Sequence, residues 1–424
     1  MDVDPNRSAL AHLYRRAGFG ARPDELDAAV AAGWGSTVAH LLDMNRPDPN
    51  ADAVALPQLP PLSPGKPPQA GAIDDQLVAW WLDRMIVTAN PLREKLALFW
   101  HGHFATSVQK VKEPELMYRQ NQIFRSAGAG RFGDLALTVA KDPAMLIWLD
   151  ANSDRKASPN ENLARELMEL FVLGIGHYSE DDVKNAARAF TGWQVDRQSG
   201  NFRLAANQHD TGPKTFLGQT GNFSGEDIVR IATSRPETAR FVAQKVFSHF
   251  ARPVSFDDGI VSDLSSAFAK DLDVSKLMAG VFAHPEFTST ATRTGLVKQP
   301  VEYVAGALRA LGLRARDVPA LAQLLAGLGQ VPFAPPNVGG WPQNTYWLNT
   351  STALARLRFA QAVTARAALT PLSSVSAPAR PEAAVRLLSV DGWSPSTTDA
   401  LSSVADDPKA LLTVALVSPE YVLA

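Results

Sequence analysis

Apolar residues recur three and four positions apart along most of the chain, and this spacing predicts helices rather than strands. It is clearest in residues 158–193, SPNENLARELMELFVLGIGHYSEDDVKNAARAFTGW, where glycines separate two apolar stripes. Ser158 and Glu161 have the spacing of a capping box, so we expect the first helix to start at Ser158. Ser179 and Asp182 repeat this chemistry before the second stripe. The stretch therefore predicts a helical hairpin.

The periodicity changes in two places. Residues 194–204 alternate weakly, which predicts a small β-hairpin within residues 192–218, and residues 47–71 are Pro-rich and aperiodic, which predicts a loop or linker. We expect a mainly α protein, a multi-helix globular bundle with a small β-hairpin insertion. Its segments are an N-terminal helical segment 1–46, the loop 47–71, a main helical domain 72–368 with a motif-rich site region 94–218, and a C-terminal helical segment 369–424.

The composition of the chain excludes several classes of partner and of chemical site. With 41 basic and 43 acidic residues the net charge is -2, so we expect no nucleic-acid partner. The chain has no cysteine, which excludes disulfides, thiolate metal sites and cysteine nucleophiles and leaves nitrogen and oxygen as metal ligands. No apolar run reaches membrane-spanning length, and the start, MDVDPNRSALAHLYRRAGFG, lacks the pattern of a signal peptide. We therefore expect a cytoplasmic protein with no membrane span.

The first helix of the predicted hairpin carries a polar face. Asn162, Glu166 and Glu169 stand at i, i+4 and i+7, which places them on one side of a helix. That side fits either a ligand-binding surface or a solvated stripe on which Arg165 offsets the negative charge.

Two histidines flank a glycine in the motif FWHGHF. Inside a helix His101 and His103 cannot share a face, but if the helix ends at Gly102 their imidazoles can converge on a metal. Hydrogen-bonded packing of both rings is the alternative.

Further candidates lie outside the hairpin. His209, Asp210 and Lys214 stand in a turn-forming loop, which fits either a site element or an Asx-type turn. Arg16, before a glycine turn, can cap a helix or bind an anion. Trp341, in PPNVGGW, can form a substrate wall or cover the core.

Several of these stretches form a series of long motifs in a fixed order: LYRRAGFG, FWHGHF, DPAMLIWLD, NENLARELMELFVLGIG, ARAFTGW, the HD loop and PPNVGGW. With them the chain resembles, over nearly its whole length, the bacterial family catalogued as domain of unknown function 1800. The resemblance implies no catalytic residue. It implies export for many members, a pattern from which this chain departs by lacking a leader. It also implies a partner protein from a second family that resembles alkaline phosphatases and sulfatases.

Two classes of function fit these observations. In the first, the protein is a metal-dependent enzyme, hydrolase-like and acting on a small-molecule ester or a glycan. Its predicted catalytic residues are Glu166, Glu169, His209 and Asp210; its metal ligands are His101, His103, Glu166 and His177; its substrate-binding residues are Arg16, Asn162, Arg165, Trp193, Lys214 and Trp341. A His/carboxylate set of this kind suits zinc, manganese or iron.

Two alternatives stay open. A metal-free variant of the enzyme uses the two glutamates as acid and base on a glycan. In the second class the same polar residues form a buried hydrogen-bond network in a non-catalytic binding or assembly protein.

Overall fold

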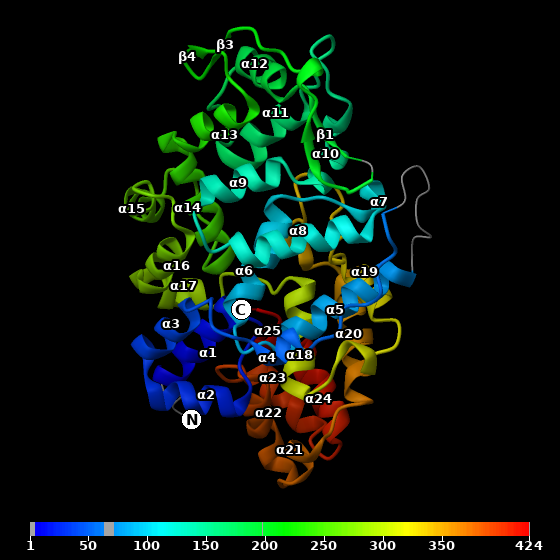
Figure 1. Ribbon diagram of the computed structural model, residues 1–424. Coiled ribbons are helices and arrows are strands. Elements are labelled where there is room, and N and C mark those ends of the chain that lie inside the picture. The colour runs from blue at the N-terminus through cyan, green and yellow to red at the C-terminus, as the bar shows by residue number, and fades with distance from the viewer. Residues whose placement is uncertain (1–4, 63–71, 197, 424) are drawn as a thin grey trace.

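The computed structural model describes residues 5–62, 72–196 and 198–423 of the chain. In these residues the protein is mainly α-helical with two small antiparallel hairpins, which confirms the predicted fold class (Figure 1). The hairpins lie at one end of the molecule, the C-terminal helices lie at the other, and α6 (Pro91–His103) runs through the middle (Figure 1).

The other helices follow one another closely along the chain. Before the hairpins they are α1 (Pro5–Ala17), α2 (Pro23–Ala32), α3 (Trp34–Leu42), α4 (Pro49–Asp52), α5 (Ala72–Val87), α7 (Val108–Val111), α8 (Pro114–Ala127), α9 (Phe132–Ala140), α10 (Pro143–Trp148), α11 (Asn162–Glu166), the π-helix η2 (Leu167–Val172) and α12 (Glu180–Phe190). After the hairpins they are α13 (Gly225–Thr233), α14 (Pro236–Phe250), α15 (Gly259–Phe268), α16 (Val274–Ala283), α17 (Thr290–Arg293), α18 (Pro300–Leu311), α19 (Leu321–Leu328), α20 (Thr350–Thr364), α21 (Thr370–Ser373), α22 (Arg380–Leu388), α23 (Pro395–Ser403), α24 (Pro408–Val417) and α25 (Pro419–Val422).

The predicted helical hairpin is present, but its first helix starts later than expected. Ser179 caps α12 and Asp182 returns the bond, as the capping-box pattern predicts. The prediction that Ser158 caps the preceding helix is wrong. Ser158 instead forms an isolated β-bridge with Arg155, and α11 begins only at Asn162. Ser158 and Glu161 have the spacing of a capping box, but residues 158–161 are not part of a helix.

The first helix changes its winding after one turn. At Glu166 the α-helix α11 gives way to the π-helix η2, which spans Leu167–Val172. A π-helix has more residues per turn, so the i, i+4, i+7 alignment of Asn162, Glu166 and Glu169 is lost at this junction. π-helical turns are rare and often lie at functional sites.

The two hairpins follow α12 directly. Strands β1 (Trp193–Val195) and β2 (Phe202–Leu204) pair with Trp193 opposite Leu204, which agrees with the small β-hairpin predicted within residues 192–218. Strands β3 (Lys214–Phe216) and β4 (Gln219–Gly221) form a second hairpin, which the sequence pattern did not predict. β3 packs against α12, whereas β1 packs against α10.

One hydrophobic core connects the predicted segments. It includes Leu10 in α1 and Val422 in α25, and α1 is tied to the C-terminal segment by the bond from Arg15 Nη1 to the Ser389 carbonyl at 2.8 Å. The predicted loop begins with a packed piece, because Asp48 caps α4 and is buried; residues 63–71 of that loop lie outside the described part. Within the described residues no helix has the length and apolar character needed to span a bilayer.

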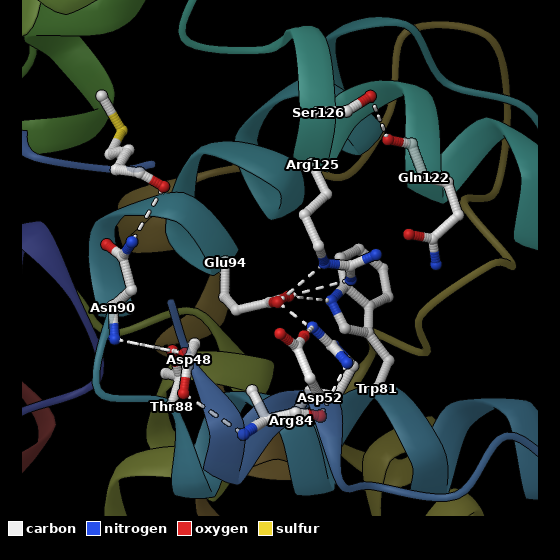
Figure 2. A network of polar contacts seen from close by, with 12 residues as sticks. Asp48, Asp52, Trp81, Arg84, Thr88, Asn90, Glu94, Gln122, Arg125 and Ser126 are labelled. Atoms are coloured by element: carbon white, nitrogen blue, oxygen red, sulfur yellow. Dashed lines mark hydrogen bonds and ion pairs between the residues drawn. The ribbon is translucent and has the colours of Figure 1, made fainter. Parts of the chain in front are cut away.

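A buried ion-pair network joins α5, α6 and α8. Figure 2 shows the Glu94 carboxylate approached by Trp81, Arg84 and Arg125. Arg125 donates to both oxygens, at 2.7 and 2.9 Å, while Trp81 Nε1 and Arg84 Nε donate at 3.0 and 3.3 Å. Glu94 is fully buried, so these four bonds replace its hydration. Glu94 therefore holds three helices together.

A second buried carboxyl predicts a pH dependence of stability. Asp142 accepts hydrogen bonds from Met145 N at 3.1 Å and from Gln120 Nε2 at 2.6 Å, but burial without a cation raises its pKa to about 7. In the unfolded chain the pKa is about 3.9. Its contribution to stability is therefore complete below about pH 4 and is lost as the pH rises through about 7.

We expect Asp142→Asn, which keeps an acceptor without the charge, to gain stability relative to the wild type between pH 5 and pH 8, by about 1 to 3 kcal/mol. Urea unfolding at several pH values measures this difference. Asp196→Asn is the control, because hydrogen bonds from Ser199 lower the pKa of Asp196 and the effect of this variant should therefore stay constant between pH 5 and pH 8. A difference that stays constant with pH would contradict the prediction for Asp142.

Candidate functional site

Three of the long motifs, FWHGHF, NENLARELMELFVLGIG and PPNVGGW, meet at one pocket. Its walls come from the end of α6, the π-helix η2, the last turns of α14, the start of α18 and the loop before residue 344. The side chains that matter for its chemistry are His103, Lys245, His249, Gln299 and Trp341. The cavity volume is about 70 Å³, which has room for a few water molecules or one small functional group.

Two glycines let the motifs approach each other closely. Gly340 has φ +79°, and a Cβ on it would stand 2.2 Å from the carbonyl oxygen of Gly102. This contact places Trp341 over Gly102 and against the ring of His101, with ring centroids 5.2 Å apart. FWHGHF and PPNVGGW thus form one packed unit at the pocket.

His103 presents a free ring nitrogen. Its Nε2 lies 2.8 Å from the carbonyl oxygen of Phe171, in the last turn of the π-helix. A carbonyl only accepts, so Nε2 carries the hydrogen, and burial lowers the pKa of His103 to about 3, which keeps the ring neutral. Nδ1 therefore has a lone pair, and no described residue donates a hydrogen bond to it.

His249 is held in the same tautomer as His103, with its hydrogen on Nε2. Its Nδ1 accepts from Gln299 Nε2 at 3.3 Å, and burial lowers its pKa to about 4, so Nε2 carries the hydrogen. Nε2 has no hydrogen-bond partner, and the nearest carboxylate oxygen, Glu302 Oε1, is 3.9 Å away. Glu302 also accepts from Gln299 N at the start of α18. The carboxylate of Glu302 thus lies directly behind two wall residues.

Buried cations surround Glu302. Lys95 is paired with it at 2.7 Å and also donates to the Gly18 carbonyl. Arg16 and Lys298 are buried too, and among the described residues neither forms an ion pair. Burial and the nearby Arg15 lower the pKa of Arg16 to about 9, and burial lowers that of Lys298. Positive groups therefore outnumber carboxylates behind the pocket.

Lys245 adds a cation at the entrance. It stands one helical turn before His249, so both side chains face the same side of α14. Lys245 is exposed to solvent, yet desolvation by the protein atoms packed around its side chain lowers its pKa. Among the described residues no carboxylate pairs with it.

The predicted metal ligands do not come together. Helix α6 continues through His103, so the condition for convergence of the two imidazoles, a helix end at Gly102, is not met. The Nε2 lone pair of His101 is used by the Phe333 N–H at 2.9 Å. Glu166 lies on α11, and His177 packs on the ring of Phe256. Within the described residues no group of three or more His, Asp or Glu side chains could hold a metal ion.

The predicted catalytic glutamates form a separate cluster at the surface. Burial and the neighbouring Glu169 raise the pKa of Glu166, and Tyr178 donates to Glu169 at 2.8 Å. Arg165 forms ion pairs with Glu161 and Glu180, and Asn162 is exposed. Only Leu170, on the following turn, reaches the pocket.

The HD loop is held by its own contacts. His209 Nδ1 bonds the Thr191 carbonyl at 2.9 Å, and Asp210 pairs with Arg188 at 2.7 Å. Lys214 is buried and donates to the carbonyls of Asp210 and Gly212. Trp193 is also fully buried, where it covers the core. These predicted site residues stabilise the loop and do not reach the pocket.

The structure adds residues that the sequence did not single out. Of the predicted residues, His103 and Trp341 line the pocket and Arg16 lies behind it, while Lys245, His249, Gln299 and Glu302 were missed. A signal was present: Lys245 and His249 stand four apart, on one face of α14. The approach of α14 to α6 could not be read from that spacing.

Comparison with known proteins places the chain in a family. No curated protein and no solved structure matches it. Residues 12–423 match the family described as Protein of unknown function (DUF1800), which confirms the resemblance carried by the motifs. Because that match spans nearly the whole chain, the protein belongs to the DUF1800 family.

Proposed function

We propose that the protein binds a small anionic group, such as a carboxylate, sulfate or phosphate, in the pocket between α6, α14 and α18. The observation that carries this proposal is the surplus of buried cations behind the pocket wall: Arg16 and Lys298 lack ion pairs among the described residues, and Lys95 is paired with Glu302. Unpaired buried charge is costly, and a bound anion would offset that cost. The small cavity suits one anionic group rather than a whole sugar ring.

The two histidines suit the same ligand. The Nε2–H of His249 has no acceptor in the described chain and can donate to an anion, while the free Nδ1 of His103 can accept a hydrogen bond. Because burial lowers the pKa of His103 to about 3, its ring is neutral and only a weak base. His103 therefore suits a hydrogen bond from a hydroxyl group or water beside the bound anion.

Metal-dependent hydrolysis stays a prediction. Its original ligand set is dispersed, and the one ring nitrogen that remains free for a metal in FWHGHF is Nδ1 of His103. Elemental analysis of the purified protein before and after chelation tests it directly, because a metal enzyme would carry near-stoichiometric zinc, manganese or iron.

The anion proposal is tested by Lys245→Met, which removes the entrance cation and keeps the aliphatic stem. A charge-assisted hydrogen bond contributes about 1.5 to 3 kcal/mol, so we expect sulfate and acetate to bind roughly 10- to 150-fold more weakly. Isothermal titration calorimetry measures both affinities.

Lys184→Met is the matched control, because Lys184 is exposed on α12 and already pairs with Asp181. It should bind both anions as the wild type does. Equal affinities of wild type and Lys245→Met for both anions would contradict the proposal.

A further inference from the structure

A second hollow lies at the surface above the Glu94 network. It is bounded by α5, α6, α8 and the segment that follows α4, and its volume is about 520 Å³, in the range of small-molecule sites. Three arginines line it: Arg84, Arg93 and Arg125. It shares no lining residue with the pocket described above.

The three arginines differ in how far they are paired. All three side-chain nitrogens of Arg84 donate hydrogen bonds: to Glu94, to Asp52 at 2.9 Å and to the Ala51 carbonyl. Arg125 uses Nε and Nη2 for Glu94. Its third nitrogen, Nη1, has no partner in the described chain although the residue is only 8% exposed. Figure 2 shows this free end pointing toward Gln122, another wall residue.

Arg93 is the least engaged cation of the hollow. Its Nε is buried without a hydrogen-bond partner, and among the described residues no carboxylate forms an ion pair with it. The hollow therefore offers N–H groups from two arginines, one from α6 and one from α8, that nothing in the described chain accepts.

The remaining wall combines aromatic and apolar side chains with three polar ones, Gln122, Ser126 and Asp52, the last of which is paired with Arg84. Trp80 lies close to the guanidinium groups of Arg84 and Arg125, whose centres are 5.6 and 5.4 Å from its ring. Tyr118 packs edge-on against Trp80 with the ring centroids 5.4 Å apart, and Leu56 is 38% exposed at the rim. Such a surface favours a flat or apolar body beside the charged group.

We propose that this hollow binds a carboxylate carried on an aromatic or apolar body, with Arg93 and Arg125 as its ligands and Tyr118 and Leu56 in contact with the body. A carboxylate has two acceptor oxygens in one plane, which matches two donors better than the three oxygens of a phosphate do. The site is independent of the proposed function, because its residues belong to neither α14 nor α18.

Calorimetry with benzoate, phenyl phosphate and benzyl alcohol tests the proposal. The wild type should bind benzoate more tightly than phenyl phosphate, and benzyl alcohol at least 10-fold more weakly. Arg93→Gln should weaken benzoate binding at least 10-fold and leave benzyl alcohol unchanged. Tyr118→Ala should weaken all three ligands, because each carries the same ring.

Arg119→Gln is the matched control on α8, since Arg119 pairs with Glu115 outside the hollow, and it should bind benzoate normally. Lys245→Met should also bind benzoate at this site, which separates a failure here from a failure of the first pocket. Equal benzoate affinity in wild type and Arg93→Gln, or equal affinity of the wild type for benzoate and benzyl alcohol, would overturn the proposal. Preference for phenyl phosphate would overturn the choice of carboxylate.

Discussion

Replacing Glu94 with glutamine is expected to lower the free energy of unfolding by about 3 to 5 kcal/mol, the cost of removing one partner from a buried ion pair. Glutamine keeps the size of the side chain and one acceptor oxygen, but it leaves Arg84 and Arg125 with no buried counter-charge. Urea unfolding followed by circular dichroism measures the change.

The pH dependence of the free energy of unfolding gives an independent check on the contribution of the Glu94 ion pairs. Burial alone would raise the pKa of Glu94, but Arg125 and Arg84 lower it to about 2. The stabilisation is therefore present above about pH 4 and disappears as the pH falls through about 2. Glu115→Gln is the control, since Glu115 forms a partly exposed i,i+4 pair with Arg119 that contributes about 0.5 kcal/mol or less. Similar losses in both variants would show that the Glu94 network contributes no more than a surface pair.

Gly340→Ala is expected to lower the free energy of unfolding by roughly 2 to 5 kcal/mol. About 1 to 2 kcal/mol comes from a side chain at positive φ, and about 1 to 3 kcal/mol comes from moving the backbone of Gly102 away from the new Cβ. Because that contact positions Trp341, sulfate binding at the pocket should weaken as well. Thermal unfolding and calorimetry measure the two effects.

Gly176→Ala separates the cost of a side chain at positive φ from the cost of the collision with Gly102. Gly176 has φ +89°, but a Cβ there would meet nothing within 4 Å, so this variant has the conformational cost without the collision. If Gly340→Ala proves no more destabilising than Gly176→Ala, close contact between the two motifs is not needed for stability.

Local chemistry made much of the fold predictable. The apolar periodicity identified the helices, and the capping box at Ser179 located the start of α12. The box at Ser158 failed because Asp154 accepts the Asn160 N–H at 2.8 Å and keeps the backbone out of the helix. The switch to a π-helix at Leu167 was not predictable, since it follows from packing that spacing does not record.

The candidate site was predictable only in part, for the same reason. FWHGHF and PPNVGGW were recognised, and both reach the pocket through His103 and Trp341. Which ring nitrogen of His103 is free depends on the Phe171 carbonyl, 68 residues away along the chain. The role of Lys245 and His249 depends on how α14 packs against α6, a long-range contact that the spacing on either helix does not reveal.

The wall behind the pocket has a consequence for the order in which the protein matures during synthesis. Lys298 donates its backbone N–H to the Val422 carbonyl, and its ammonium group lies 3.6 Å from the ring centroid of Tyr421. A ribosome-bound chain that ends before α25 therefore has all the wall residues and still lacks this support. Nascent chains should accordingly become able to bind an anion late, only after the segment through Val422 has left the exit tunnel.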